Sequence, residues 1–468
     1  MDSSRDGGTN IVLKRIVDHL SDHVEGYREY FQNKTSDGHE LCQAYITGLF
    51  KAEAGKRNIE RLNEEIDMSG DSYQRMQQFI TDSPWSAGNL IGAIAQNTSD
   101  LYANQADCRC QDIGYIVDES AHLKKGNHSV GVARQYAGVI GKVENCQVGV
   151  YASLVWQSHS TLINERLFLP ACWTSDSARC EKAGVPVEAR QFKTKLELAL
   201  DMIQSDVAAG VEFDWVGGDG LYGHGLEFGN ALENSGLKFV LDVHYDQKIY
   251  PIKPSLFVPE KTAGRGPKPT KKQADHDSIQ VKWYAKHLHP FEWKTIAVRN
   301  GTKGPVTLSV HTAQVWVWDG EADHVTERVL VISRNHADHK MKYSLSNVDY
   351  RSTPIERLAY MQAQRYWVER AFQEAKSELG MSDYQVRKWD AWHHHMALVM
   401  LSLSFIVKER MTYKADYPLL SCRDVRLMII ALLIKDPDFI TKRIKQMMVR
   451  HEQRRKDIER RYSLVGTG

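Results

Sequence analysis

The chain lacks the features by which several classes of protein are recognised in sequence. Its seven cysteines form no CxxC pair and no Cys/His ligand series, so a zinc motif is not indicated. A disulfide framework is not expected in a chain of 468 residues, and we predict a location in a reducing cytoplasm. The most apolar stretches, 395–407 and 427–434, are interrupted or too short to cross a bilayer. No signal or transit pattern marks the N-terminus, so we do not expect a membrane protein.

The chain as a whole has almost no excess of either charge, because its net charge is only +1, but basic residues are concentrated in two segments. Segment 261–272 contains five basic residues and no acid, and segment 442–461 contains nine basic and three acidic residues. Such segments can bind nucleic acid although the total charge of the chain is near zero. For the first segment, a solvated linker and a DNA-contacting arm both fit, and the unopposed charge favours the arm. Its candidate DNA contacts are Arg265, Lys268, Lys271 and Lys272.

The order of patterns along the chain predicts an α/β fold. Residues 9–106 have helical spacing, and strands follow at 114–117, 129–140 and 146–156, which we expect to form a three-stranded meander. Helix, strand, helix and strand come next, up to residue 243. Three antiparallel strands followed by this alternation is the order expected of a mixed, ribonuclease-H-like sheet.

A β-rich segment then interrupts this pattern. Between about 245 and 350 the composition shifts to Pro, Lys, Trp and Thr, and strand-like runs occur at 279–284, 295–299, 307–310, 315–318 and 328–333. We therefore predict an insertion that splits the core. The predicted domains are an N-terminal helical domain (1–108), for which DNA binding and a packing role both fit, the first part of the core (109–244), the β-rich insertion (245–350), the second part of the core (351–410) and a basic C-terminal helical region (411–468).

Three acids are the strongest candidates for chemistry. Asp118 ends the apolar run GYIV, Asp219 lies among glycines in GGDGLYG, and Glu369 belongs to the helical segment QRYWVERAFQEAK. Carboxylates delivered by separate elements can converge to hold two divalent cations, which activate an oxygen nucleophile and offset charge at a phosphate. Two of these acids also have a purely structural explanation. Asp118 can simply end a strand, and the glycine-rich segment around Asp219 can form a tight turn between a strand and a helix. The glycines make a poor nucleotide-binding loop, because neither a Walker A lysine nor GxGxxG spacing is present.

The segment that carries Glu369 adds two cations. On a continuous helix, Arg365, Glu369 and Lys376 fall within about 40° of one another, at the border of an apolar stripe. An intrahelical ion-pair network explains this spacing. A metal ligand flanked by two cations that grip DNA phosphates explains it equally well.

At this point the sequence resembles a known family. Three residues separate Arg365 from Glu369 and six separate Glu369 from Lys376, which is the R(3)E(6)K part of the Tyr-Arg-Glu-Lys signature of DDE transposases of bacterial insertion sequences. The phrases DESAHLKKG, VGVARQYAGVIGKVENCQVGV, GGDGLYG and DSPW also look like that group, which carries a β-rich insertion before the Glu. The signature Tyr position falls on Gln362 here, with Tyr360 and Tyr366 nearby.

The resemblance implies a DNA transposase with an RNase-H-like core. Asp118, Asp219 and Glu369 would bind two Mg²⁺ or Mn²⁺ ions; water would cleave the element's ends, and the freed 3′-hydroxyl would attack target DNA. It further implies a homodimer on paired DNA ends, in the cytoplasm and associated with the bacterial nucleoid.

Four further residues are candidate DNA contacts. Lys124 and Lys125 follow Asp118 on the first hairpin, where a solvated turn is the alternative. Trp316 and Trp318 project to one face of a predicted strand, where core packing and stacking on a flipped base both fit.

Two other functions remain open from the sequence. The chain could be a DNA-binding regulatory protein derived from a transposase, although the intact acids argue against that. It could also be an RNase-H-like, metal-dependent nuclease without strand transfer. Inverted repeats flanking the coding region would favour transposition over both.

Overall fold

The molecule has a mixed α/β architecture, which confirms the predicted fold class at that level. The structure is a computed structural model that describes residues 15–32, 37–66, 72–104, 113–260, 269–301 and 304–433, with a few positions between 448 and 460. It divides into two compact units. The first comprises the described residues of 1–108, 118–212 and 367–468, and the second those of 109–117 and 213–366. The chain crosses between them inside strand β1 (Gly114–Leu123), at Val117 and Asp118.

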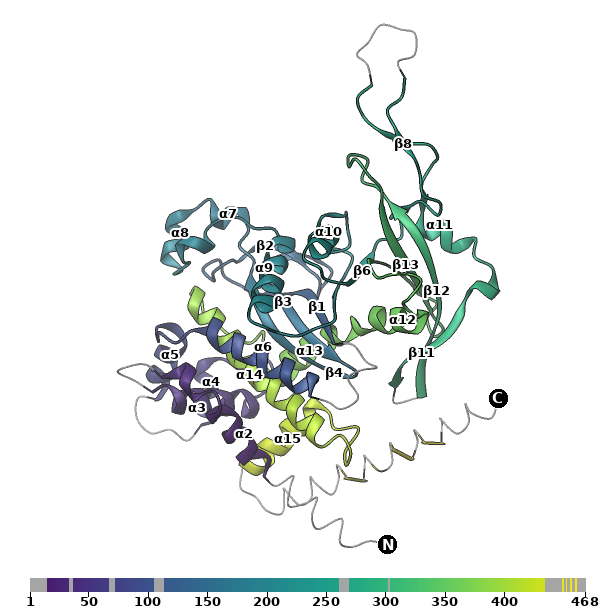
Figure 1. Ribbon diagram of the computed structural model, residues 1–468. Coiled ribbons are helices and arrows are strands. Elements are labelled where there is room, and N and C mark those ends of the chain that lie inside the picture. The colour runs from purple at the N-terminus through teal and green to yellow at the C-terminus, as the bar shows by residue number, and fades with distance from the viewer. Residues whose placement is uncertain are drawn as a thin grey trace. The chain divides into compact units, whose positions relative to one another are not determined.

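Helices dominate the first unit, and the helical prediction for its N-terminal part is confirmed. Its helices are α2 (Ile16–Glu25), α3 (His39–Lys51), α4 (Ile59–Glu64), α5 (Ser72–Thr81), α6 (Ala87–Ala103), α7 (Ala171–Thr174), α8 (Ser177–Lys182), α9 (Lys195–Ala208), α14 (Trp389–Thr412) and α15 (Cys422–Leu433), with short 3₁₀ turns at Arg28–Phe31 and Val187–Ala189. The long helix α14 lies among the N-terminal helices in Figure 1 and packs against α3, α5, α6 and β4. Every residue from His394 to Val407 is buried, as expected of a core helix.

The strands of the first unit do not form the predicted meander. Their order is β1–β3–β2, with β3 (Lys142–Trp156) in the middle and β2 (Ala133–Ala137) on its far side. A strand that the sequence did not reveal, β4 (His159–Leu167), pairs with the second half of β3, whereas β2 pairs with the first residues of β3. The length of β3 therefore lets one strand serve two antiparallel partners.

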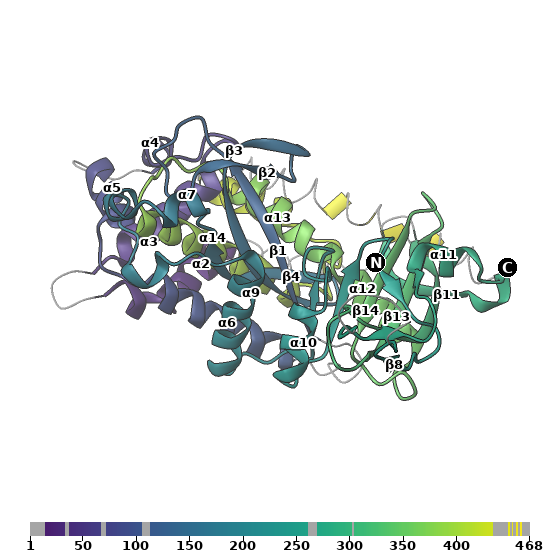
Figure 2. The ribbon, with the colours of Figure 1, turned by 90° about the horizontal axis from the view of Figure 1, so that it is seen from above.

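In the second unit the strand order is β11–β12–β13–β14–β6–β5–β1. Strand β5 pairs in parallel with its two neighbours, β1 and β6. All the other neighbours in this order, from β6 through β14, β13 and β12 to β11, pair antiparallel. Figure 2 shows helix α12 beside this sheet, where it contacts β6, β11, β12 and β13. The elements are β5 (Trp215–Gly218), α10 (Glu227–Asn234), β6 (Phe239–Val243), β7 (Lys248–Ile249), β8 (Leu256–Phe257), β9 (Gln273–Ala274), β10 (Ile279–Gln280), α11 (Val281–Lys286), a 3₁₀ turn (Pro290–Glu292), β11 (Lys294–Gly301), β12 (Gly304–Val317), β13 (Thr326–Asn335), β14 (Met341–Ser346) and α12 (Ile355–Gln364).

The segment 245–350 is β-rich as predicted, but its details differ. The expected strand at 279–284 is mostly helix α11, and the run at 307–310 and residues 315–317 of the next run belong to the single strand β12. Strand β14 was missed, although it joins the β11–β13 strands to β6 through four residue pairs from Tyr343↔Val243 to Ser346↔Val240. Trp318 lies beyond the end of β12, so it does not share a strand face with Trp316.

The predicted continuous helix around Glu369 is interrupted. Helix α12 ends at Gln364, Arg365 forms the turn, and a new helix, α13 (Tyr366–Leu379), carries Glu369 and Lys376. Arg365 therefore does not share one uninterrupted helix face with the other two residues.

Candidate active site

Two aspartates follow the end of a parallel strand pair. The register of β1 against β5 runs from Gly114↔Trp215 to Val117↔Gly218, and the next residue of each strand segment is Asp118 or Asp219. The carboxyl ends of parallel neighbours deliver their side chains to the same edge of a sheet, which is where ligands bind in α/β folds. Backbone N–H groups orient both carboxylates: Glu119 donates to Asp118 Oδ1 at 2.8 Å, and Leu221 donates to Asp219 Oδ1 at 2.9 Å.

A third acid at these strand ends was not predicted. Asp118, Glu119 and Asp219, all half-buried, each offer one carboxylate oxygen, and these oxygens lie within 4.8 Å of one another. Carboxylates this close repel one another unless a cation or a proton compensates their charge. Hard oxygen ligands at this density suit Mg²⁺ or Mn²⁺, so the acids present fit the predicted type of metal.

Glu119 also has a partner of its own. The Lys195 ammonium donates to Glu119 Oε1 at 2.8 Å. Lys195 is the first residue of α9, whose start is fixed by a capping box in which Thr194 and Glu197 satisfy each other's backbone N–H groups. The sequence signal for Glu119 was its position directly after Asp118. Nothing in the sequence indicated the approach of α9.

The glycines around Asp219 serve packing. A Cβ atom on Gly223 would lie 1.9 Å from the Asp242 carbonyl oxygen, and one on Gly217 would lie 2.6 Å from the side chain of Ile116. Both contacts are closer than any real Cβ makes. The atom that faces Gly223 is backbone, so this loop can approach β6 only with glycine there, whereas the atom nearest to Gly217 is the Cδ1 end of the Ile116 side chain, which can move.

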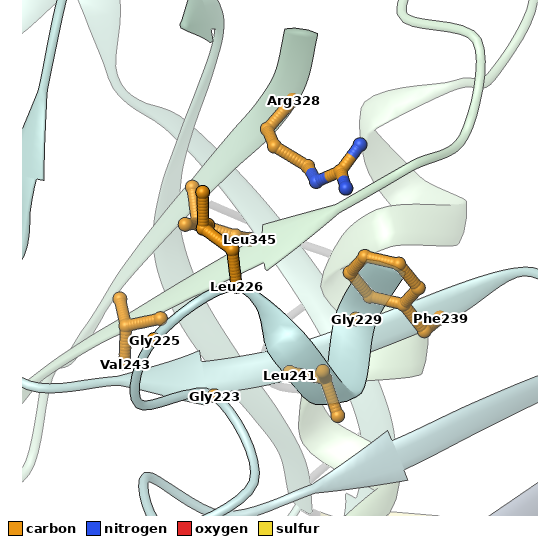
Figure 3. A pocket seen from close by; sticks show the side chains of 9 residues that line it. All are labelled: Gly223, Gly225, Leu226, Gly229, Phe239, Leu241, Val243, Arg328 and Leu345. Carbon is orange, nitrogen blue, oxygen red and sulfur yellow. The ribbon is translucent and has the colours of Figure 1, made fainter. Parts of the chain in front are cut away.

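Behind the loop that follows Asp219 lies a small void in the second unit, lined by Gly223, Gly225, Leu226, Gly229, Phe239, Leu241, Val243, Arg328 and Leu345 (Figure 3). Its volume of about 20 Å³ is enough for about one water molecule and too small for a substrate. Arg328 is buried here, and its guanidinium donates to Asn230 Oδ1 and Glu233 Oε2, both at 2.8 Å. This arginine thus fixes helix α10 to β13.

Helix α13 carries the predicted third ligand, Glu369. Its side chain is exposed, contrary to the half-buried position expected from the sequence, and it is absent from the group of close carboxylates. Lys376 lies two turns further along the same helix and is half-buried. Burial lowers the pKa of Lys376, and the negative charge of Asp118 opposes that shift, so the ammonium lies within the electrostatic reach of this acid.

The other two signature positions of this segment have structural partners. Arg365 donates from Nε to Asp242 Oδ2 at 2.9 Å in a half-buried ion pair. Gln362, which replaces the signature tyrosine, is buried and donates from Nε2 to the Ser344 hydroxyl at 2.7 Å and to the Val331 carbonyl at 3.2 Å. Its amide thus anchors α12 to strands β13 and β14.

The predicted DNA contacts have different surroundings. Lys124 donates to the Tyr384 carbonyl at 2.8 Å and lies over that ring, 3.4 Å from its centroid, whereas Lys125 is exposed. Lys271 is exposed, and Lys272 forms a 2.8 Å ion pair with Asp323. Trp316 and Trp318 are both half-buried, and Trp318 donates to the Ala322 carbonyl at 2.9 Å. Arg265 and Lys268 lie outside the described residues.

Comparison with known proteins places the chain in a family. Residues 27–305 match the family described as DDE superfamily endonuclease, which is more than half of the chain and includes Asp118 and Asp219. The chain therefore belongs to the DDE superfamily endonucleases.

A curated relative shows to which kind of DDE protein the sequence is similar. Over 183 residues, the chain is 28% identical to a probable transposase for the insertion sequence element IS701 of Microchaete diplosiphon. The match covers 37% of this chain and 42% of the relative, so the chain spans less than half the length of that protein. The predicted resemblance to transposases of insertion sequences is thereby confirmed.

One solved structure, the NurA nuclease from Sulfolobus solfataricus, aligns with 76% of this chain and all of its own at 10% identity and a TM-score of 0.23, which is too low to support an argument. Among the helices that the structure describes, none combines the length and the apolar character needed to span a membrane.

Proposed function

We propose that the chain is a DNA transposase that cleaves the ends of its element and joins the freed 3′-hydroxyl to target DNA. The observation that carries this proposal is the parallel register of β1 and β5, in which an aspartate directly follows the paired segment of each strand. Family membership and the transposase relative support the same reading. The core that holds these acids is proposed to be RNase-H-like, since it combines an antiparallel β3 with parallel β1, β5 and β6.

Asp118 and Asp219 are proposed to hold two Mg²⁺ or Mn²⁺ ions through their carboxylate oxygens. Bound metal would supply an activated water and compensation for charge at the phosphate. Glu369 is proposed to complete the ligand set from α13. Lys376, whose ammonium interacts electrostatically with Asp118, is proposed to neutralise a phosphate oxygen beside the acids.

The domain boundaries at 108, 244, 350 and 410 are part of the proposal, as are DNA binding by the N-terminal helices and a homodimer on paired ends in the nucleoid. Among the candidate DNA contacts, the exposed Lys125 and Lys271 can reach a phosphate without breaking a contact described above. Arg365 and Lys272 would have to exchange a carboxylate partner for phosphate.

The test is cleavage and joining by the full-length protein. The substrate is a labelled duplex that carries the inverted repeats flanking the coding sequence, with a supercoiled plasmid as target. We expect Mg²⁺-dependent nicking and joined products, both abolished by EDTA. Asp118→Asn and Asp219→Asn should each lower the rate by about a hundredfold or more. Asp277→Asn, which changes an exposed aspartate of the second unit, is the matched control.

Cleavage without joined products would support a nuclease instead of a transposase. Binding of the ends with no Mg²⁺-dependent cleavage would support the regulatory protein and reject the enzymatic proposal. Full activity of Asp118→Asn in Mg²⁺ would remove the assigned metal site.

The identity of the third acid has its own test. If Glu369 is the ligand, Glu369→Gln should be as defective as Asp118→Asn, while Glu119→Gln retains most activity because Glu119 is held by Lys195. The opposite order would assign the role to Glu119. Measuring both variants in Mn²⁺ as well as Mg²⁺ separates weakened metal binding, which Mn²⁺ relieves, from a folding defect, which it does not.

A further inference from the structure

A second concave site lies wholly within the first unit. Its volume is about 540 Å³, within the range of small-molecule sites. Its walls come from the start of α6, from β4, from the end of α9 and from the start of α14. None of the acids proposed for catalysis lines it.

Negative charge predominates on the walls of this cavity. The lining contains Glu165 on β4, Asp206 on α9 and Asp390 on α14. Among the described residues that line it, Arg166 is the only lysine or arginine. The Arg166 guanidinium donates to two neutral acceptors, the Asn164 side-chain oxygen and the Glu165 carbonyl, both at 2.7 Å. Arg166 is therefore held in the wall by neutral groups, and it leaves the three carboxylates in excess.

The imidazoles of the lining do not reverse this excess. The His393 ring lies with Nδ1 2.5 Å from Glu165 Oε1. Even with a proton on both of its nitrogens, three carboxylates face two cations. His394 stacks on Trp85 with ring centroids 3.8 Å apart, and burial lowers its pKa from 6.5, so this ring adds no charge at pH 8. The cavity as a whole therefore attracts positive charge.

The carboxylate of Glu165 is the least compensated of these groups. Its side chain is only 2% exposed. Oε1 has the His393 imidazole as its partner, whereas Oε2 has no hydrogen-bond partner among the described residues. Burial of a carboxylate is destabilising when water is removed without an equal number of donors in its place. A cation held in the cavity would compensate this charge across the poorly polarisable wall.

The acids are spread around the walls instead of converging on one point. Among the described residues, three ligand atoms of acids, histidines or cysteines lie within 4.8 Å of one another only at Asp118, Glu119 and Asp219. A single metal ion therefore does not match the acids of the cavity. Positive charges spaced along one extended molecule can meet them separately. Trp85 and Trp389 also line the cavity, and the faces of indole rings attract ammonium groups.

We propose that this cavity binds an aliphatic polyamine, a flexible chain that carries two or more ammonium groups. The ammonium groups would lie toward Glu165, Asp206 and Asp390, and the methylene chain would lie along the two indole rings. Such a ligand supplies positive charge at several points and apolar surface between them, which is what the walls lack and offer. The proposal goes beyond the DNA reaction and uses none of the residues assigned to it.

Calorimetry of the full-length protein, freed of nucleic acid, tests this proposal. Measurements at pH 8 in EDTA do not depend on catalytic metal, so their outcome is independent of the proposed transposase activity. Putrescine is compared with N-acetylputrescine, which keeps the four-carbon chain but has lost one of the two charges. We expect putrescine to bind about tenfold more tightly or better, because each ammonium group makes charge-assisted hydrogen bonds.

Substitutions assign the binding to this cavity. Glu165→Gln should weaken putrescine binding about tenfold. Asp390→Asn changes an exposed acid of the lining, which puts the fold at less risk, and should weaken binding about threefold. Glu188→Gln, at an exposed acid of the same unit outside the lining, should leave the affinity unchanged. Asp118→Asn should also leave it unchanged, which separates the cavity from the acids proposed for catalysis.

Three results would overturn the proposal. The first is an absence of putrescine binding by wild-type protein, and the second is equal affinity for putrescine and N-acetylputrescine. The third is unchanged binding by both Asp390→Asn and a folded Glu165→Gln protein. If Glu165→Gln does not fold, Asp390→Asn and the comparison of the two ligands decide.

Discussion

His159, the first residue of β4, should make the fold sensitive to acid. Its side chain is 4% exposed, and neither ring nitrogen has a hydrogen-bond partner among the described residues. The ring stacks on Trp156 with centroids 6.1 Å apart and planes at 19°. Burial lowers the pKa of His159 from 6.5 to about 3, and the positive charges of Arg410 and Lys414 act in the same direction.

The sign and size of the effect follow from proton binding. Above pH 6.5 the imidazole is neutral in both states. Between pH 6.5 and about 3 the unfolded chain binds a proton that the folded protein does not, so the free energy of unfolding falls as the pH falls. Each pH unit in this window corresponds to about 1.4 kcal/mol. At pH 5, His159 alone should therefore remove about 2 kcal/mol relative to pH 8.

His159→Phe isolates this contribution. Phenylalanine keeps a ring beside Trp156 and does not titrate, and the substitution also removes a buried N–H group that has no acceptor. Urea unfolding of wild type and variant at pH 8 and pH 5 gives the loss of stability on acidification. We expect that loss to be about 2 kcal/mol smaller in the variant.

Other buried histidines contribute equally to both proteins and cancel. His128→Phe, at an exposed histidine of the same unit, is the control and should match wild type. If His159→Phe loses as much stability between pH 8 and pH 5 as wild type, the reasoning is refuted.

Three smaller predictions concern the backbone and can be checked by the midpoint of urea unfolding. Gly223→Ala places a Cβ 1.9 Å from the Asp242 carbonyl oxygen and should cost about 3 kcal/mol; a loss below 1 kcal/mol would mean that the loop yields easily. Thr194→Ala removes the capping box of α9 and should cost about 1 kcal/mol, whereas an unchanged midpoint would show that Lys195 alone fixes the helix start. Gln157 has φ 55° in the β3–β4 turn, so Gln157→Asn should stabilise by about 0.5 kcal/mol, and destabilisation would contradict strain there.

The sequence was informative where apolar periodicity and turn residues agreed. The strand that begins at Gly114 and the order helix, strand, helix and strand up to residue 243 were predicted as observed. Strand β4 was missed for two reasons. Its first seven residues are all buried, so the sequence shows no alternation of polar and apolar residues, and the turn that connects it to β3 contains no glycine. Segment 279–284 alternates like a strand, but Val281 and Ala285, four residues apart, are both buried, as a helix requires.

The two aspartates could be predicted because each follows a short apolar run, and parallel strand ends meet at one sheet edge. Glu119 was missed because its approach depends on Lys195, far away in sequence. The break at Arg365 was missed because no proline or glycine marks it, and the ion pair with Asp242 depends on tertiary packing. The signature spacing identified the family, but it did not determine where the Glu369 side chain lies.

The tight contact at Gly223 affects how mutagenesis of this protein can be interpreted. In a saturation screen scored by transposition, this position would be as intolerant as the nearby Asp219, since any added side chain meets the backbone carbonyl oxygen of Asp242 and displaces the loop from β6. A map of inactive variants would then outline a region larger than the chemical centre. Only a parallel readout of folded protein would tell the residues that do the chemistry from those that make room for it.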